Sequence, residues 1–442
     1  MIATNVKYKK TGIAWMPEVP THWKLIRLKF ISDVKFSTVD KHSHKEEMKV
    51  RLCNYVDVYK NEYITNDLEF MEASATDDEI KRFSVKKGDI LLTKDSETFN
   101  DIAVPAFVVD DIENLVCGYH LAQVRVNEHI IDSNFLYRVL QSRVVNHHFT
   151  IAAKGVTRCG LSYDDISSVF IPFPESLEEQ KAIARILEKE SAKITRFIQT
   201  KQRFIELLKE QRQSIITNAV TKGIDDGVKI KETVLGEIPE HWEVRRLKFC
   251  LNERLKYGAN ASGDYYNPSW YRYIRITDFT ADGTLDENNK LSLSPENGKD
   301  YELKDGDILL ARSGATVGKS FQFRLVDRDE RCSYAGYLIK ASPNEEIILS
   351  DFLYNYTLSS NYENWKNSIF IKATIENISA DKYANLLVTL PPVEEQKRIL
   401  EHIKSETKTL DIAISKAERE IELIKEYREA MIAEAVTGRI KL

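Results

Sequence analysis

Hydrophobic and polar positions follow the same order of patterns twice along the chain. In the first half, KGDILLTK and LAQVRVN contain short apolar runs, which predict buried strands. The second half repeats these runs as DGDILLAR and GYLIKAS. In residues 132–149 and 349–365, apolar residues lie three and four positions apart behind an Asp or Ser, which predicts one helix in each half. Strands VFIPFP and LVTLPP then close two mixed α+β portions.

The pattern changes after those prolines. Residues 177–221 and 393–437 contain no proline or glycine, and their apolar residues form a stripe at helical spacing. Each segment predicts a helix about 65 Å long at about 1.5 Å per residue. Basic residues predominate in the first helix and acidic residues in the second, which favours pairing of the two with each other. We expect an antiparallel pair; the alternative is that each helix folds back on its own domain.

Specific phrases recur with the patterns. THWKLIRLKF begins at Thr21 and EHWEVRRLKF at Glu240, while LEEQK begins at Leu177 and VEEQK at Val393. The period stays at roughly 220 residues, so each repeat is the size of a domain rather than of a solenoid unit. Within these phrases, the residues that form the two His-Trp pairs are interpreted as packing residues: His22, Trp23, His241 and Trp242.

The sequence therefore predicts an α+β protein with a pseudo-twofold internal repeat. Two similar globular domains of mixed strands and helices occupy residues 1–174 and 223–391. Two long antiparallel coiled-coil helices, residues 175–222 and 392–442, separate them.

Composition narrows the class of protein. The chain has 442 residues, of which 30% are charged, and a net charge of −5, so charge alone does not indicate a nucleic-acid binder. Its five cysteines form no Cys-x-x-Cys pair, which fits a reducing cytoplasm better than a disulfide framework. We see neither a signal peptide nor an apolar run long enough for a membrane helix, and we expect a cytoplasmic protein.

Three fragments resemble catalytic motifs without meeting their requirements. SGATVGKS, residues 313–320, is one residue too short for a phosphate-binding loop and leads into a predicted strand instead of a helix. LPPV, from Leu390, lacks the amide or acid and the aromatic of an amino-methyltransferase loop. PENGKDYELK, from Pro295, is spaced too tightly for a nuclease core. We therefore predict no catalytic residue and no metal site in this chain.

The ordered, duplicated set of motifs resembles the specificity subunit of type I DNA restriction-modification systems, over nearly the whole chain. The resemblance implies two target-recognition domains, each reading one half of a split double-stranded DNA sequence, with the paired helices as a spacer. It also implies two DNA methyltransferase subunits and restriction/translocase subunits as partners. S-adenosylmethionine, ATP and Mg would then be bound by those partners, and no cofactor by this chain.

Candidate DNA-binding residues lie in the loop after each GDILL strand, in the loop before the last strand, and in an aromatic segment of the second half. All offer hydrogen-bond donors suited to phosphates or purine edges. The alternatives are a solvated loop and, for the aromatic segment, a strand packed in the core. The candidates are Lys94, Ser96, Lys154, Thr157, Arg158, Arg272, Arg275, Arg312, Ser313, Thr316, Lys319, Lys372, Thr374 and Asn377.

Candidate partner-binding residues are polar positions that the two long helices share. A coiled coil needs only its apolar stripe repeated, so shared polar residues suggest a surface for identical partners. Helix capping and surface salt bridges are the alternative. The candidates are Glu179, Gln180, Lys181, Glu395, Gln396 and Lys397.

Other functions remain open at this level. The chain is also compatible with a coiled-coil adaptor bearing two protein- or ligand-binding heads, with a nuclease whose site is unrecognised, or with a specificity partner for a single-chain restriction-methylation enzyme. The bases of either half-site and the gap between them do not follow from the sequence.

Overall fold

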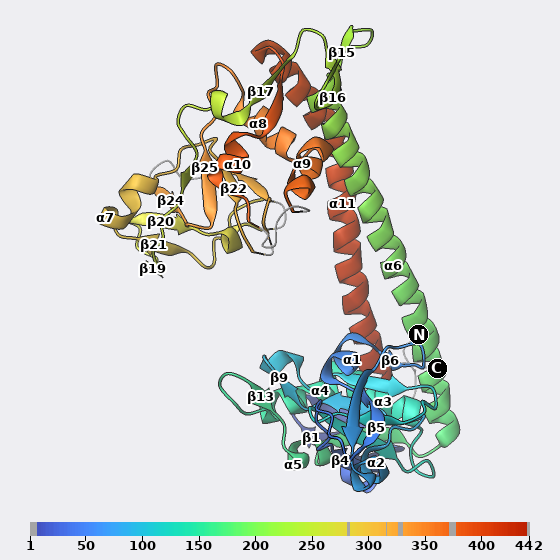
Figure 1. Cartoon of the computed structure of the whole chain (residues 1–442). Helices are drawn as coiled ribbons and strands as arrows, with labels where there is room; N and C mark the ends of the chain where they lie inside the picture. The colour runs from blue at the N-terminus through green and yellow to red at the C-terminus, as the bar shows by residue number, and fades with distance from the viewer. Residues whose placement is uncertain (1–6, 281–282, 315, 326–329, 371–376, 440–442) are drawn as a thin grey trace. The chain divides into compact units, whose positions relative to one another are not determined.

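The computed structural model describes residues 7–280, 283–314, 316–325, 330–370 and 377–439. Its contacts divide the chain into two compact units (Figure 1). Unit 1 contains residues 1–201 and 419–442, and unit 2 contains residues 202–418. Each unit thus combines one strand-rich portion with part of both long helices.

Unit 1 is built around a five-stranded sheet whose central strand is fully buried. Its strands are, in spatial order, β4 (Ser32–Phe36), β12 (Leu121–Val126), β8 (Ile90–Thr93), β10 (Pro105–Val108) and β6 (Tyr63–Ile64). A second sheet contains β11 (Leu115–Cys117), β5 (Met48–Cys53) and β7 (Met71–Ala75). All four residues of β8 are buried, as the apolar run predicts.

Helices and two-stranded ladders complete this portion. The ladders pair β1 (Tyr8–Ile13) with β2 (Met16–Pro20), β3 (Trp23–Arg27) with β14 (Phe170–Pro174), and β9 (Asp95–Ser96) with β13 (Cys159–Gly160). The helices are α1 (Tyr55–Lys60), α2 (Asp77–Phe83), α3 (Ser133–Gln141), α4 (Arg143–Ala152) and α5 (Tyr163–Ser167).

Unit 2 repeats this plan with shorter strands. One sheet has the order β18 (Lys256–Tyr257), β25 (Leu338–Ala341), β22 (Ile308–Ala311) and β23 (Ser320–Gln322). The other has the order β19 (Asp264–Tyr265), β21 (Leu291–Leu293), β20 (Tyr271–Ile274) and β24 (Cys332–Tyr334). The ladders pair β15 (Ile230–Thr233) with β16 (Gly236–Pro239), and β17 (Glu243–Arg246) with β26 (Leu387–Leu390). The helices are α7 (Pro295–Gly298), α8 (Ser350–Thr357), α9 (Ser360–Phe370) and α10 (Ala380–Ala384).

The Gly-Asp pair before each central strand forms the predicted turn. Gly88 and Gly306 have φ of 89° and 88°, a conformation that glycine adopts without strain. The buried carboxylate of the following aspartate closes the turn, because Asp89 accepts a hydrogen bond from Lys86 N and Asp307 from Lys304 N, each at 2.8 Å. GDILL therefore encodes a turn and a core strand.

We predicted one continuous helix over residues 132–149 and one over residues 349–365, and this was wrong because both segments are interrupted. Each segment forms two helices, α3 with α4 and α8 with α9. Ser142 ends α3 and caps α4, since its hydroxyl accepts a hydrogen bond from Val144 N. Ser359 similarly accepts from Tyr362 N at the break before α9. Serine competes for backbone donors, so apolar spacing alone conceals such breaks.

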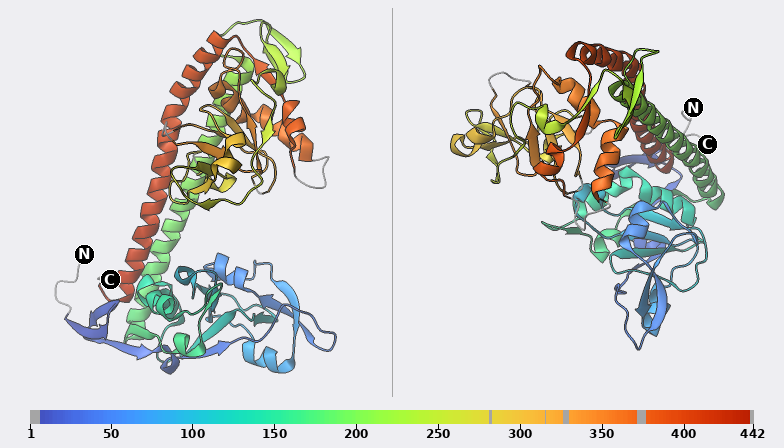
Figure 2. Two further views of the ribbon diagram at one scale, coloured as in Figure 1. Left: turned by 90° about the vertical axis from the view of Figure 1, so that its left-hand side faces the viewer. Right: turned by 45° about the horizontal axis from the view of Figure 1, so that its top comes forward.

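The two long helices are α6 (Leu177–Lys222) and α11 (Val393–Val436). Figures 1 and 2 show them side by side within each unit. In unit 2, Lys209 pairs with Glu418 at 3.2 Å and Arg212 with Asp411 at 2.7 Å, so the helices run antiparallel. Lys201 and Glu420 form an ion pair in unit 1. In every one of these pairs α6 supplies the cation and α11 the carboxylate, as the charge asymmetry predicts.

The predicted boundaries between strand-rich and helical portions, at residues 174–175 and 391–392, fall within a few residues of the starts of α6 and α11. The compact units differ from the predicted segments because each long helix divides between both units. None of the helices among the described residues is both long and apolar enough to span a membrane.

Candidate nucleic-acid interface

In each unit, a cation follows the central strand and lies over an aromatic ring of the edge strand. In unit 1, the Lys94 ammonium lies 5.7 Å from the centre of the Phe36 ring and 4.7 Å from that of Tyr119. In unit 2, the Arg312 guanidinium lies 4.7 Å from the centre of the Tyr257 ring. The strand registers make these positions equivalent. Phe36 on β4 pairs with β12 at the position that corresponds to the pairing of Tyr257 on β18 with β25. The arrangement holds each cation at one end of the sheet.

The two loops predicted to carry DNA-binding residues lie side by side in both units. In unit 1, β9 pairs with β13, and Leu161 N donates to Lys94 O at 2.9 Å. In unit 2, Ser313 forms a bridge with Asn377, and Ile378 N donates to Arg312 O at 2.9 Å. Loops some sixty residues apart in sequence thus form one surface at the end of each sheet. We call these surfaces face 1 (residues 94–101 and 153–160) and face 2 (residues 312–314, 316–319 and 377–379).

The predicted residues differ in how accessible they are. On face 1, Lys154, Thr157 and Arg158 are exposed. Ser96 is buried, and Lys94 is 12% exposed with its ammonium 3.0 Å from Asp95. The predicted donors of face 1 that solvent reaches therefore lie in its second loop.

On face 2 the partly and fully exposed candidates belong mainly to the first loop. Lys319 is exposed, and the half-buried candidates are Arg312, Ser313, Thr316 and Asn377. The buried Nε of Arg312 has no hydrogen-bond partner in the described part of the chain. Lys372 and Thr374 lie outside the described residues.

The two arginines of the aromatic segment are engaged within unit 2. Arg272 is 3% exposed, and its guanidinium contacts Glu287 at 2.9 Å and Glu330 at 3.2 Å. Arg275 is 32% exposed and pairs with Asp278 at 2.7 Å. Moving Arg272 to DNA would break its contact with Glu330, which is 14% exposed and would keep Lys290 at 3.2 Å, at a cost of roughly 1.5–3 kcal/mol. The position of Arg272 therefore supports a structural role in β20.

Sequence reasoning missed a third segment at the same end of each sheet. His120 O accepts from Lys94 N at 3.1 Å, and Tyr337 O accepts from Arg312 N at 3.0 Å. Tyr337 is 67% exposed, and Tyr119 beside His120 is 51% exposed. The only signal in the sequence was an aromatic residue near the start of each predicted strand, Tyr119 two positions before LAQVRVN and Tyr337 within GYLIKAS, which by itself is indistinguishable from a core residue.

Face 1 also borders an aromatic pair that was not predicted. Tyr55 and Tyr59 stack with ring centres 5.5 Å apart on α1, and the Tyr59 hydroxyl donates a hydrogen bond to Asp101. Burial raises the pKa of Tyr55, and the hydrogen bond to Asp101 raises the pKa of Tyr59, so both phenols keep their proton at neutral pH. Stacked, neutral tyrosines offer flat apolar surface and a hydroxyl beside the donors of face 1.

The shared Glu-Gln-Lys residues of the long helices are mostly committed inside their own units. Glu179 accepts a hydrogen bond from Trp23 Nε1 at 3.2 Å, and Glu395 accepts one from Trp242 Nε1 at 3.0 Å. The two tryptophans are 2% and 0% exposed, which confirms their predicted packing role. His22 and His241, both near the surface, contact the same two glutamates. The repeated glutamate therefore anchors the start of each long helix to the His-Trp phrase.

The glutamine makes a second internal anchor. Gln180 and Gln396 are both 0% exposed. Gln396 accepts from Leu349 N at 2.8 Å and donates to Ile347 O and Pro391 O at 2.9 Å. Gln180 makes the corresponding three bonds, to Asp132 N, Ile130 O and Pro174 O. These contacts account for the repeated glutamines without a partner, and of the six candidates only Lys181 and Lys397 have exposed side chains.

A different repeated stripe on the helices includes exposed side chains, although Ile205, Leu208 and Ile421 within it are buried. Residues 203–212 of α6 read RFIELLKEQR, and residues 419–428 of α11 read REIELIKEYR. Leu207 and Leu423 are each 47% exposed, and their neighbours are shared acids and bases. Arg203 pairs with Glu206 as Arg419 pairs with Glu422, each at 3.0 Å. One copy of this stripe belongs to each unit.

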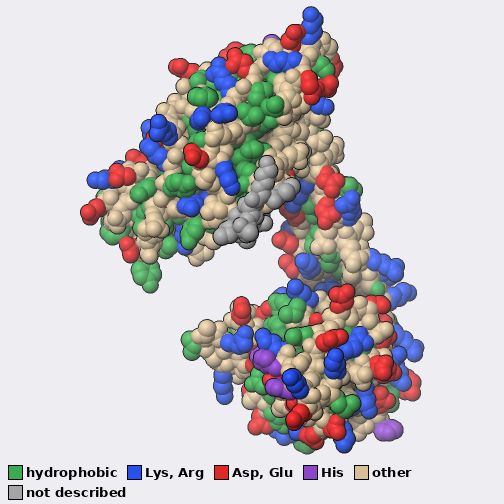
Figure 3. Space-filling model, viewed as in Figure 1, with side chains coloured by type: hydrophobic (Ala, Val, Ile, Leu, Met, Phe, Trp, Pro, Cys, Tyr) green, Lys and Arg blue, Asp and Glu red, His purple; other side chains and the backbone are tan. Residues whose placement is uncertain are grey.

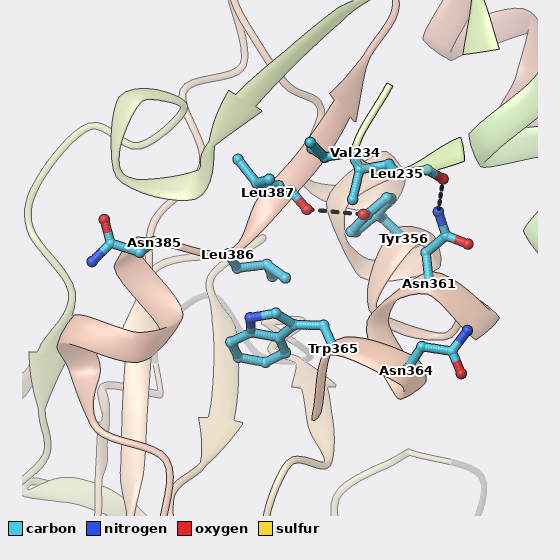
Figure 4. A pocket seen from close by; sticks show the side chains of 9 residues that line it. All are labelled: Val234, Leu235, Tyr356, Asn361, Asn364, Trp365, Asn385, Leu386 and Leu387. Atoms are coloured by element: carbon cyan, nitrogen blue, oxygen red, sulfur yellow. Dashed lines mark hydrogen bonds between the residues drawn. The ribbon is translucent and has the colours of Figure 1, made fainter. Parts of the chain in front are cut away.

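Figure 3 shows basic and acidic side chains interspersed over both units, so the face in view carries no field of one sign. A recess of ≈ 400 Å³ lies in unit 2, where the turn of the β15–β16 hairpin faces α9 and β26 (Figure 4). Asn361 donates to Leu235 O at 3.2 Å and Tyr356 to Leu387 O at 2.9 Å, so the chain itself uses these polar groups. Among the described residues, no three His, Cys, Asp or Glu side chains are grouped to hold a metal ion.

Comparisons with known proteins agree on one family. A family model for the type I restriction modification DNA specificity domain matches residues 20–207 and 239–423. The type I restriction enzyme MjaVIII specificity subunit of Methanocaldococcus jannaschii is 24% identical over 440 residues, which cover 96% of this chain and 94% of that protein. The EcoBI specificity subunit of Escherichia coli is 24% identical over 340 residues, 74% of this chain and 70% of that protein.

A solved structure supports the fold. A chain from a study of complex assembly and conformational transition of the type I R-M system has a TM-score of 0.64 and 16% sequence identity. The match covers 96% of this chain and 99% of that one.

Proposed function

The chain belongs to the type I restriction-modification DNA specificity family, and on that premise we propose that it binds double-stranded DNA at a target in two parts. Face 1 reads one part and face 2 the other. The observation that carries this proposal is the joining of the two donor-bearing loops at the end of one sheet, in both units.

The chemistry of the faces supports reading of DNA. Lysine, arginine, threonine and asparagine on loops match phosphate oxygens and purine edges, and exposed tyrosines supply stacking surface. The two faces share their backbone plan but differ in side chains. His120 and Tyr337, for example, occupy the same position beside the cation. Equal scaffolds with unequal side chains suit two readers of different half-sites.

We further propose that the chain directs DNA methyltransferase and restriction subunits to the target. The exposed side chains of the stripe of residues 203–212 and of its copy in residues 419–428 offer two equivalent surfaces, one for each of two identical methyltransferase subunits. The paired helices act as the spacer between the half-sites. Methylation and cleavage, with S-adenosylmethionine, ATP and Mg, belong to the partner subunits, and this chain supplies recognition.

The test of DNA reading is a binding titration at increasing salt, followed by selection from a randomised duplex library. We expect affinity to fall steeply, with a log–log slope of about −4 or steeper, because several phosphates are contacted. A flat salt dependence would instead indicate an adaptor that binds protein or another ligand.

Single variants then assign each face to a half-site. Arg158→Ala should relax base preference or weaken binding only through the first half-site, and Lys319→Ala only through the second. Lys81→Ala on α2 and Lys299→Ala near α7 remove exposed lysines outside the two faces and serve as matched controls. If either face variant altered the opposite half-site alone, the assignment of faces would be reversed; if neither altered binding, the faces would not be the reading surfaces.

A further inference from the structure

Four residues are identical in the two units and lie at the surface or beside it. The phrase RLKF occupies residues 27–30 in unit 1 and residues 246–249 in unit 2. In both it forms the end of a strand followed by a short 3-10 helix, η1 (Leu28–Phe30) and η3 (Leu247–Phe249). We call these segments motif 1 and motif 2.

The leucine of each motif explains the local fold. Leu28 is 0% exposed and Leu247 is 1% exposed, so both belong to their cores. Leu28 N donates to Val169 O at 2.9 Å, and Leu247 N donates to Leu386 O at 2.8 Å. These contacts fix the segment identically in both units, but they place no requirement on the other three side chains.

The phenylalanines are not explained by packing. Phe30 is 65% exposed and Phe249 is 62% exposed, although phenylalanine is among the residues most often buried. Beside them, the Lys29 and Lys248 ammonium groups lie 5.4 and 5.2 Å from the ring centres. Motif 1 and motif 2 therefore present an exposed aromatic ring beneath a lysine in the same way.

The cations of the motifs have no acidic partner among the residues that the structure describes. Within the described part of the chain, no carboxylate lies within ion-pair distance of Arg27, Lys29, Arg246 or Lys248, although ion pairs are frequent elsewhere. Arg27 lies over the Phe170 ring, and Arg246 and Lys248 each donate to the neutral Asn385 side chain at 3.3 Å. Each motif thus presents two uncompensated positive charges next to an apolar ring.

The motifs lie at the end of the sheet away from the reading faces. In unit 1, Ser32 follows motif 1 and opposes Val126, whereas Phe36, at the other end of β4, opposes Ala122 beside face 1. Four residues of strand separate the two ends by about 13 Å. In unit 2, Leu251 after motif 2 bridges to Pro343, while Tyr257 opposes Ile339 beside face 2. This placement favours a protein partner over the bases and phosphates read by the faces.

We propose that motifs 1 and 2 are two equivalent docking surfaces for a protein present in two copies. Each copy supplies carboxylates for the arginine and lysine and an apolar recess for the phenylalanine ring. The identity of the motifs follows from the identity of the two copies, whereas the reading faces differ because the half-sites differ. This inference rests on the proposed function, in which the partner in two copies is the methyltransferase subunit.

The experiment reconstitutes the full chain with the methyltransferase subunit of its own system and measures the bound stoichiometry by native mass spectrometry and the affinity by calorimetry. The first variant combines R27E, K29E and F30S, the second R246E, K248E and F249S, and the third carries both sets. The control combines K45E, K49E and M48S, because those exposed residues of unit 1 give the same charge change and loss of apolar surface without a repeated counterpart.

We expect the wild-type chain and the control to bind two methyltransferase subunits. Each single-motif variant should bind one subunit with unchanged affinity and the other about tenfold or more weakly, since anchoring aromatic and arginine residues dominate interfaces. The variant with both motifs changed should lose both subunits at the same concentration. DNA affinity of the chain alone should stay within about threefold of wild type, because the motifs lie away from the faces.

Other outcomes overturn the inference in distinguishable ways. If the variants bind two subunits as tightly as the control does, the motifs are not docking surfaces, and the proposed function stands. If they lose DNA affinity but keep both subunits, the cations contact phosphates, and docking is refuted. A wild-type chain that binds no methyltransferase refutes the proposed partner and this inference together. Should a combined variant unfold in thermal scans, F30A and F249A decide the question with the same readout, because both rings are exposed.

Discussion

The buried glutamine at the start of each long helix provides a quantitative test of how that helix is anchored within its own unit. Gln396→Met replaces the amide with a side chain of similar size that makes no hydrogen bonds of comparable strength. Three backbone groups then lose their partner: Pro391 O in a buried hydrogen bond, and Leu349 N and Ile347 O in partly buried ones. An unsatisfied buried group costs roughly 1–3 kcal/mol and each partly buried bond roughly 0.5–1.5 kcal/mol, so we expect unit 2 to lose about 3 kcal/mol of stability. That is a large part of the roughly 5–15 kcal/mol typical of a folded domain.

Hydrogen exchange measured by mass spectrometry reports this loss of stability for each peptide separately. Peptides that cover residues 345–358 should exchange about 100-fold faster or more in Gln396→Met, since each 1.4 kcal/mol is worth about a factor of ten. Peptides from unit 1 serve as the internal reference. Gln180→Met should produce the mirror result, with faster exchange over residues 128–140 and little change in unit 2.

Lys397→Met is the matched control. Lys397 is the next residue of α11, and its exposed ion pair with Glu394 contributes less than about 1 kcal/mol. If Gln396→Met changed exchange no more than Lys397→Met does, the three hydrogen bonds would not be a structural anchor. If it left stability intact but abolished methyltransferase binding, the sequence-based interpretation of this glutamine as a partner contact would be restored.

Three further outcomes follow from the same contacts. Arg272→Met should destabilise unit 2 by roughly 1.5–3 kcal/mol in a urea titration, because the largely buried Glu330 loses one of its two cations, while base preference in a library selection stays unchanged. Leu207→Glu together with Leu423→Glu should weaken methyltransferase binding about tenfold in calorimetry and leave the thermal unfolding midpoint within a few degrees, since both leucines are exposed. Insertion of seven residues into each long helix, in register with the apolar stripe, should lengthen the tolerated gap between half-sites by about three base pairs, from about 1.5 Å per residue, without changing the bases selected.

Much of the fold was predictable because it depends on local chemistry. The absence of proline and glycine from α6 and α11 left only long helices, and their opposite charge balance selected the pairing seen between Lys209 and Glu418. The Gly-Asp turns before β8 and β22 were predictable for a similar reason, since only glycine adopts their backbone conformation freely. The break between α3 and α4 at Ser142 was not predicted, because a capping serine and a solvent-facing serine look the same in a helical pattern.

The candidate site was predicted less completely, because accessibility is a property of the assembled unit. The sequence indicated the two loops that carry Arg158 and Lys319, and the structure joins each to its neighbour at the end of a sheet. It did not reveal that Arg272 pairs with Glu330, some sixty residues later, or that Tyr337 points outward. Such facts depend on long-range contacts that no local spacing encodes.

Exposure sorts the repeated residues into two classes with different causes. Gln180 and Gln396 are identical because each is buried and satisfies three groups of its own unit, a demand that exists without any partner. Phe30 and Phe249 are identical although nothing in their units requires a ring there. An exposed identity across two domains whose reading faces diverge needs an external constraint applied equally to both. Two copies of one partner supply such a constraint, whereas two unlike half-sites of DNA do not, and the side chains of faces 1 and 2 differ accordingly.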